Sequence, residues 1–447
     1  MKPQPVRIAP SRTQLLAVAA IGIPALTLAA AGILTPVMIS VLAALLALAV
    51  FDAWTARRSL ARISVIGPQL VRLWKDRESG FDLMFQNEEQ CARTLRVAPL
   101  LPDEIVSKPE EMTVALPEAA PHSRVEWRCE PRKRGRYDLA GCAVETASPM
   151  RFWQARAVLP LRTEIRVYPN LASQQKNAPD LFLRRPQIGL RMHRQVGKGR
   201  EFEKLREYAP GDGFDEIDWK ATARRGHPIT RVFQVERTQE VYIALDASRL
   251  TARPGSDGES SILERNITAS LLLALAAEKR GDLFGLLTFS DRVHGFVRAR
   301  NGKSHYGSCR EALYNLEPRI VTPDFDEVCS MLRMNLRRRA LIVFLTELDD
   351  PALSESFLRN VRLLRRQHLV LVAVAKPQAA RPLFEGKQPD TIDDIYGDLA
   401  GHLLWTKLRE LSITLERMGV HFAMLDSANA GVQLASLYAG IKQRQLL

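Results

Sequence analysis

The sequence predicts an α/β protein, with a doubly wound parallel sheet that follows a small β-sandwich and an N-terminal transmembrane helical hairpin. Three observations predict this order. No charged residue stands between Thr13 and Phe51, short alternating runs fill much of the next hundred or so residues, and apolar strands then alternate with amphipathic helices to the end of the chain. We expect five segments: 1–12, a cytoplasmic N-terminus; 13–55, two transmembrane helices; 62–170, the β-sandwich; 186–237, a segment of unusual composition; and 238–447, the α/β domain.

The uncharged stretch is long enough for two membrane helices, because about 20 apolar residues cross a bilayer. We interpret Thr13–Leu34 and Pro36–Trp54 as a hairpin with Pro36 at the reversal. Basic residues flank the stretch on both sides, so the positive-inside rule places both ends and the rest of the chain in the cytoplasm. A cleavable signal peptide is the competing interpretation, but the stretch is about twice as long as an h-region and has no obvious cleavage site.

Composition limits the classes of protein that fit. The five cysteines of the 447 residues have neither paired nor metal-type spacing, which is typical of a reducing compartment and predicts no disulfide and no zinc site. The net charge is +13, but the bases are interleaved with acids and lack aromatic stacking platforms. We therefore expect membrane lipid, and no nucleic acid, as the partner of the basic residues.

The β-sandwich is predicted from runs in which apolar and polar residues alternate, as Val125, Trp127 and Cys129 do. No histidine in it is paired with a nucleophile, so we expect a structural or docking domain. The predicted strands are Phe81–Asn87, Thr94–Pro99, Met112–Leu116, Arg124–Cys129, Gly135–Thr146 and Glu164–Tyr168.

The segment 186–237 contains three acids that are spaced three residues apart, Asp212, Asp215 and Asp218. On a helix they would lie along one face and present carboxylates to a divalent cation. Gly211 and Gly213 argue against a helix at that point, and bases lie close by in sequence. Structural acids paired with those bases are the favoured interpretation.

The α/β domain is predicted from apolar strands bounded by amphipathic helices, which indicate a parallel sheet covered on both faces. Ligand sites in such sheets lie at the carboxyl ends of the strands, so Asp246 and Thr346 should share one rim. The predicted elements are Val241–Leu245, Leu263–Lys279, Leu283–Phe289, Ser308–Leu316, Phe325–Arg337, Leu341–Leu345, Leu353–Arg366, Leu369–Ala375, His402–Met418 and Val420–Leu425.

Several motifs together resemble a known bacterial family. The β-domain carries Arg134-Gly-Arg-Tyr137, the next segment carries Gly-x-Gly-Arg-Glu-Phe and Ile-Asp-Trp-Lys-Ala-Thr-Ala-Arg, and a strand ends in Leu245-Asp-Ala-Ser248. This order resembles the bacterial domain-of-unknown-function family numbered fifty-eight over nearly the whole chain. The resemblance implies a von Willebrand factor A-like terminal domain, the bacterial inner membrane as location, and a MoxR-type AAA+ ATPase as partner, often with transglutaminase-like membrane proteins.

The resemblance also implies a Mg²⁺ site, since such domains bind the ion through Asp-x-Ser-x-Ser and further oxygens of the rim. This chain has Asp246 and Ser248, but Leu250 occupies the third position. The final strand is followed by Glu347 where an Asp is usual, and Glu347 or Asp349 could substitute for that Asp. We therefore expect a degenerate metal site of Asp246, Ser248 and Glu347. The alternative is that Asp246 and Ser248 only cap the end of the strand and the loop.

Two more positions bear on the resemblance. Such sites take a Thr ligand from a separate loop. In this chain the loop after Gly302 has Ser304 or Ser308 for that role instead of a Thr. Asp215 stands where relatives usually carry Arg, so the role of that basic position in binding an acidic partner does not carry over.

These features favour a membrane-anchored scaffold or adaptor and not an enzyme, because the sequence has no nucleophile elbow, no His-Glu-x-x-His and no P-loop. The alternative is a metal-dependent hydrolase or phosphotransfer enzyme that uses the rim around Asp246. The candidates for partner binding are Arg200, Glu201, Arg206, Glu207, Tyr208, Asp212, Asp218, Trp219, Lys220 and Arg224.

Overall fold

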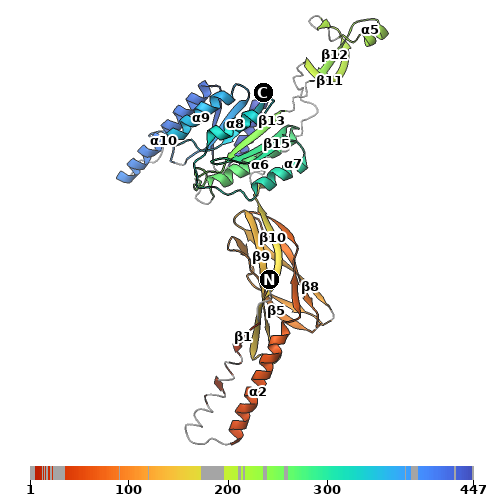
Figure 1. Cartoon of the computed structure of the whole chain (residues 1–447), viewed down its shortest axis with the longest axis vertical. Coiled ribbons are helices and arrows are strands. Elements are labelled where there is room, and N and C mark those ends of the chain that lie inside the picture. The colour runs from red at the N-terminus through yellow and green to blue at the C-terminus, as the bar shows by residue number, and fades with distance from the viewer. Residues whose placement is uncertain are drawn as a thin grey trace. The chain divides into compact units, whose positions relative to one another are not determined.

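A computed structural model gives the architecture of the chain (Figure 1). It divides the protein into two compact units, Met1–Asn170 and Leu171–Leu447. The residues that it describes are 6–12, 14, 16, 19–20, 23, 36–89, 91–118, 120–172, 196–209, 213–214, 217–234, 239–255, 260–377, 379–383, 391–426 and 429–444.

The first unit contains two β-sheets. One has the order β1-β10-β9-β5-β7 with β3 added beside β10, and the other has the order β2-β4-β8-β6. The strands are β1 Arg7–Pro10, β2 Ile63–Ile66, β3 Leu70–Trp74, β4 Ser79–Asn87, β5 Arg93–Pro99, β6 Ile105–Ser107, β7 Met112–Leu116, β8 His122–Pro131, β9 Gly135–Ala147 and β10 Trp153–Tyr168.

Side chains from both sheets form one hydrophobic core. Leu95 and Ile165 of the larger sheet and Phe85 and Trp127 of the smaller one belong to the same buried cluster. Each predicted strand of this region lies within a strand of the structure. The first half of β10 was missed because it contains Pro160, and a proline within an apolar run argues against a strand; the pairing with β9 shifts register at this point.

The helix α2, Pro36–Ser59, contains the second predicted membrane helix and continues past it. The first predicted helix, Thr13–Leu34, lies largely outside the described residues. Within the described residues, no helix combines the length and the apolar character needed to cross a membrane. The predicted cytoplasmic terminus 1–12 includes β1, which pairs with β10. The last turn of α2 joins the β-domain, since Ala56 and the following Leu60 are buried in its core.

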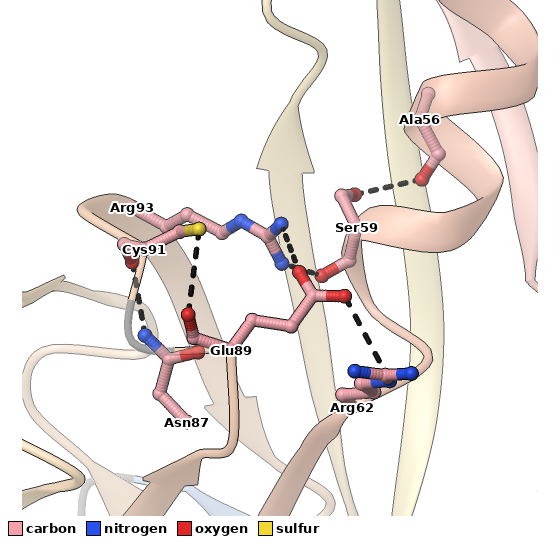
Figure 2. Close-up of polar contacts among 7 residues, drawn as sticks. All are labelled: Ala56, Ser59, Arg62, Asn87, Glu89, Cys91 and Arg93. Atoms are coloured by element: carbon pink, nitrogen blue, oxygen red, sulfur yellow. Dashed lines mark hydrogen bonds and ion pairs between the residues drawn. The ribbon is translucent and has the colours of Figure 1, made fainter. Parts of the chain in front are cut away.

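Polar contacts hold the end of α2 against the β-domain (Figure 2). The guanidinium of Arg93 donates to the backbone oxygen of Ser59 and, across 2.6 Å, to Glu89. The other oxygen of Glu89 lies 3.9 Å from Nε of Arg62, and the Ser59 hydroxyl donates to the backbone oxygen of Ala56 across 2.7 Å. A cation thus serves a carbonyl that the helix leaves unsatisfied at its end.

The second unit contains a six-stranded sheet of order β15-β14-β13-β16-β17-β18, parallel except for the edge strand β15. This confirms the predicted parallel sheet. The elements are β13 Glu240–Asp246, α6 Ile262–Lys279, β14 Leu283–Phe289, β15 Val293–Arg300, α7 Lys303–Leu313, α8 Phe325–Asn335, β16 Ala340–Leu345, α9 Pro351–Leu364, β17 Leu369–Ala375, α10 Ile392–Arg417, β18 His421–Leu425 and α11 Ala430–Gln443.

Helices cover both faces of this sheet and bury its alternating residues. Ile243 of β13 packs in one cluster with α6, α7 and α11, whereas its neighbour Ala244 packs in another with α8, α9 and α10. The strand β15 was not predicted, and α10 begins at Ile392, ten residues before the predicted His402 (402 − 392 = 10).

The segment before the α/β domain forms a hairpin. Its strands, β11 Val196–Glu207 and β12 Ile229–Gln234, pair antiparallel, and the helix α5, Trp219–Arg225, lies between them. Figure 1 shows α5 at the end of the hairpin.

Candidate functional site

The candidate site lies at the carboxyl ends of the parallel strands β13, β14, β16 and β17. Asp246 ends β13, and Thr346 and Glu347 follow β16, its neighbour in the sheet. The prediction that Asp246 and Thr346 share one rim is confirmed, because the Thr346 hydroxyl donates to Oδ2 of Asp246 across 2.6 Å.

The carboxylate of Asp246 is fully buried and already has partners on both oxygens. Oδ1 accepts from the backbone N–H of Ser248 at 2.8 Å, and Oδ2 accepts from Thr346. Burial raises the pKa of Asp246, and the hydrogen bonds from Thr346 and Ser248 oppose that shift. Asp246 therefore serves to fix the loop that leaves β13.

The rest of that loop is held by its own hydroxyl groups. The oxygen Oγ of Ser248 accepts from the backbone N–H of Leu250 at 3.3 Å. The Thr251 hydroxyl donates to the backbone oxygen of Asp246 at 3.0 Å. Leu250, which occupies the third position of the expected ligand motif, is only 4% exposed and packs as an apolar residue. These contacts match the alternative prediction, in which Asp246 and Ser248 cap the strand and the loop.

The carboxyl group of Glu347 binds the neighbouring strand. Its Oε1 accepts from the backbone N–H of Ala375, at the end of β17, across 2.9 Å. Burial raises the pKa of Glu347 to about 8; Asp349 and Asp246 add to this shift, while the Ala375 N–H and Arg253 oppose it. Glu347 is thus mainly uncharged at neutral pH.

A guanidinium lies beside these acids. Arg253 donates to both oxygens of Asp349, at 2.7 and 3.1 Å, and its Nε donates to the backbone oxygen of Leu250 at 3.0 Å. Burial alone would raise the pKa of Asp349, but the contact with Arg253 brings it below the usual value. A bidentate pair of this kind joins the loop after β13 to the loop after β16.

The residues of the rim do not fit a Mg²⁺ site. A hard cation needs several free oxygen ligands, whereas both oxygens of Asp246 are hydrogen-bonded, Leu250 supplies none, and Glu347 is largely neutral and bound to Ala375. Among the described residues, no three His, Cys, Asp or Glu side chains gather in a group that would hold a metal.

The predicted substitutes for the missing Thr lie elsewhere. The helix α7, which carries Ser304 and Ser308, follows the antiparallel strand β15, whose last residue, Arg300, lies opposite Phe284 at the start of β14. Both serines therefore lie at the edge opposite to Asp246, because the strand before them runs the other way. The loop that does reach the rim precedes α8: its Thr322 hydroxyl accepts from Nε of Arg249 at 3.3 Å. Sequence reasoning missed Thr322, whose signal was its place just before a helix start.

Four of the partner-binding candidates belong to α5 and its cap. Asp218 caps this helix by accepting from the N–H of Ala221 at 3.0 Å, so it is a structural acid. Trp219, Lys220 and Arg224 are exposed on the helix, and Trp219 is 67% exposed. Phe214, 75% exposed, was not among the candidates, although an aromatic residue between glycine and acids was a signal for it.

The other candidates lie on β11 and the turn after it. Arg200 and Glu201 belong to β11, and Glu201 lies opposite Gln234 of β12. Tyr208 is half-buried, with its ring 6.2 Å from that of Phe214, and Glu207 lies 3.4 Å from Nε2 of His227. Arg206 is half-buried and directs its guanidinium to the backbone oxygen of Glu207. Asp212 and Asp215 lie outside the described residues.

The sheet order and the helices on both faces define a doubly wound α/β domain, and loops form its rim. Residues 204–386 match the model of the family described as "Protein of unknown function DUF58", which confirms the resemblance over this part of the sequence. The uncharacterized protein Rv1480 of Mycobacterium tuberculosis is 26% identical over 180 residues, 39% of this chain and 54% of that protein. The chain thus spans about half the length of this relative.

Solved structures with similar regions include an aerotolerance-related membrane protein of Bacteroides fragilis, with 16% identity and a TM-score of 0.30 over 46% of this chain and 99% of that one. The SpRpn10 VWA domain has 9% identity and a TM-score of 0.27 over 44% and 94% of the two chains.

Proposed function

We propose that this chain is a membrane-anchored scaffold whose second unit, made of the hairpin with α5 and the α/β domain, binds a protein partner in the bacterial cytoplasm. The observation that carries the proposal is the antiparallel pairing of β1 with β10, in which Ile8 lies opposite Ala155. β1 precedes the uncharged stretch and β10 follows it, yet both belong to one sheet. A stretch that enters the bilayer between them must therefore cross it an even number of times, as the predicted two-helix hairpin does.

The outer surface of α2 supports contact with lipid. Leu46, Val50, Phe51 and Trp54 are all exposed on it, where water would be an unfavourable surrounding. The guanidinium of Arg58 in the last turn lies 3.9 Å from the centre of the Trp54 ring. Aromatic residues followed by cations are typical of the boundary between a bilayer and the cytoplasm.

The junction between α2 and the β-domain supports a fixed orientation of that domain at the membrane. Asp52 is buried within α2 and accepts from the backbone N–H groups of Met150, at 3.1 Å, and Phe152, at 3.2 Å. The indole of Trp153 donates to the backbone oxygen of Ala49 at 2.8 Å. These contacts secure the turn between β9 and β10 along the helix.

The surface around α5 supports partner binding. Phe214 and Trp219 expose aromatic rings, and Lys220 and Arg224 expose positive charge beside Trp219 on the same short helix. Exposed aromatic side chains and arginines are the residues that contribute most at protein interfaces. A partner with an acidic patch around an apolar pocket suits this surface. A MoxR-type AAA+ ATPase is the first candidate, with a transglutaminase-like membrane protein in the same assembly.

The enzymatic alternative needs a carboxylate that reaches solvent and substrate. Asp246 is fully buried, and both of its oxygens already accept hydrogen bonds. The rim is therefore better suited to hold loops in place than to activate a water molecule or a phosphate.

The partner is tested with the full chain, solubilised in detergent, against a purified MoxR-type ATPase from the same genome, with ADP and with ATP. We expect a complex that Trp219→Ala and the double variant Lys220→Glu with Arg224→Glu weaken. Arg338→Glu, exposed in the loop after α8, is the control and should bind as the unaltered chain does. Absence of binding in both nucleotide states would reject this ATPase as partner.

The anchor is tested separately by fractionation and protease protection of the full chain. We expect it in the membrane fraction, with both β1 and the α/β domain cleaved only from the cytoplasmic side. Recovery in the soluble fraction, or cleavage of the two regions from opposite sides, would contradict the hairpin.

A further inference from the structure

The N-terminal half of α10 carries an apolar stripe on its surface. The stripe consists of Ile392, Ile395, Tyr396, Leu399 and Leu403, which are between 47% and 71% exposed. Their spacing of three and four residues places them on one face of the helix. Figure 1 shows the N-terminal part of α10 extending beyond the sheet.

This stripe is not the face by which α10 packs on its own domain. Leu408, Leu411 and Leu415 are the apolar side chains of α10 that are buried, and Leu411 and Leu415 belong to the core beside α8 and α9. Leu408 follows Leu399 by nine residues, which is about two and a half turns and thus the opposite side of the helix. The helix therefore has two apolar faces, and its own domain covers one.

Charge along α10 indicates what covers the other face. The first turn is acidic, with Asp393 and Asp394, whereas Lys407 and Arg409 follow the stripe. An acidic end disfavours an anionic membrane surface. It is complementary to Lys407 and Arg409 of the same helix in the opposite direction, and two-fold pairs of identical subunits bring such regions together.

We propose that the stripe of α10 pairs antiparallel with the same stripe of a second copy of this chain. Leu399 then meets its own counterpart near the two-fold axis, Ile395 faces Leu403 of the second copy, and Asp393 comes within reach of its Lys407. Three exposed helical turns are marginal alone in water, so the contact also stabilises the start of α10. The stripe is smaller than a standard interface, so the pair is weak and reversible.

Cysteine cross-linking in the full chain tests the pairing. Cys91, the exposed native cysteine, is first replaced by Ser. We expect Leu399→Cys to give a disulfide-linked dimer under mild oxidation. The matched control is Gly397→Cys, two residues away on the other side of α10, where an added side chain meets no atom within 4 Å. Its dimer yield should be several-fold lower.

Charge exchange tests the direction of the pair in the Leu399→Cys background. Asp393→Lys and Lys407→Asp should each lower the yield of dimer several-fold, and the two together should restore it, because each helix then carries the opposite order of charge.

Equal yields from Leu399→Cys and Gly397→Cys would overturn the proposal, and so would failure of the double exchange to restore the yield. A polarity-sensitive dye on Leu399→Cys that brightens only when anionic vesicles are added would assign the stripe to lipid instead. The yield of cross-linked dimer can be measured whether the chain is recovered with membranes or in solution. This test therefore does not depend on the proposed membrane anchor.

Discussion

The carboxylate of Asp52 accepts a hydrogen bond from the Ser148 hydroxyl across 2.5 Å, and both residues are buried. Asp52 lies on a helix that begins in the uncharged stretch, and Ser148 lies in the turn between two strands of the β-domain. Burying a carboxylate costs free energy unless its oxygens are hydrogen-bonded, so the hydrogen bonds to Asp52 are needed for this junction to form. The first charge after the uncharged stretch thus serves to join the helix to the domain.

We predict that Asp52→Asn loosens this junction. An amide has one oxygen where the carboxylate has two, so at least one of the N–H groups of Met150 and Phe152 loses its acceptor, at a cost of about 1–3 kcal/mol. The amides of the turn should then exchange with deuterium roughly tenfold faster or more, measured by mass spectrometry on the full chain. Asp103→Asn, at an exposed position, is the control. Unchanged exchange in the turn would show that Asp52 does not secure it.

We predict that Glu347 makes the α/β domain less stable as the pH rises. Its pKa is raised from 4.5 to about 8, so between these values the folded state holds a proton that the unfolded state has released. Stability then falls with increasing pH across this window, by up to about 1.4 kcal/mol per pH unit, and levels off above pH 8.

The variant Glu347→Gln removes this dependence, because an amide stays neutral and its oxygen still accepts from Ala375. Thermal unfolding of the full chain at several pH values, compared between the two proteins, isolates the effect. The stability of the variant relative to that of the unaltered chain should increase from pH 5 to pH 8. Glu410→Gln, an exposed change on α10, should follow the unaltered chain. Parallel curves for Glu347→Gln and the unaltered chain would contradict the raised pKa.

Periodicity predicted the sheet of the second unit well, because its strands are continuous apolar runs between amphipathic helices. It failed at β15, an edge strand with exposed residues such as Gly295, and at the start of α10. At the start of α10, Gly397 and Gly401 lowered the helix propensity of the sequence. The capping box formed by Thr391 and Asp394, which begins that helix, was present in the sequence as a start signal.

The candidate site was predicted in part. Asp246 and Thr346 were placed together because parallel strands end at one edge. The contacts that decide its chemistry were not predictable from spacing, since the bidentate pair of Arg253 with Asp349 joins loops almost a hundred residues apart. The direction of Glu347 towards Ala375 likewise depends on the neighbouring strand.

We predict that only Cys91 reacts quickly with a maleimide in the folded chain. Cys91 is exposed, whereas burial raises the pKa of Cys129 and Cys309 to about 11 and that of Cys142 and Cys329 to about 12, so their thiols are neither accessible nor ionised. Mass spectrometry of the intact protein should show one added label, and Cys91→Ser should abolish it. Rapid labelling of a second cysteine would contradict the core of the unit in which that cysteine lies.

We predict that Mg²⁺ neither binds the rim nor stabilises it. The hydroxyl of Thr346 and the N–H of Ser248 hold the oxygens of Asp246, and Arg253 brings positive charge beside Asp349. Millimolar Mg²⁺ titrated into the full chain should give no saturable heat, and chelation should leave the unfolding temperature unchanged.

Leu250→Ser supplies the hydroxyl that the ligand motif lacks, yet should still give no binding, because the other oxygens stay engaged. It should also destabilise the domain by about 2–4 kcal/mol, as expected for loss of a buried leucine. Saturable heat with the unaltered chain would restore the degenerate metal site, and saturable heat only with Leu250→Ser would show that position 250 alone closes the rim to a cation.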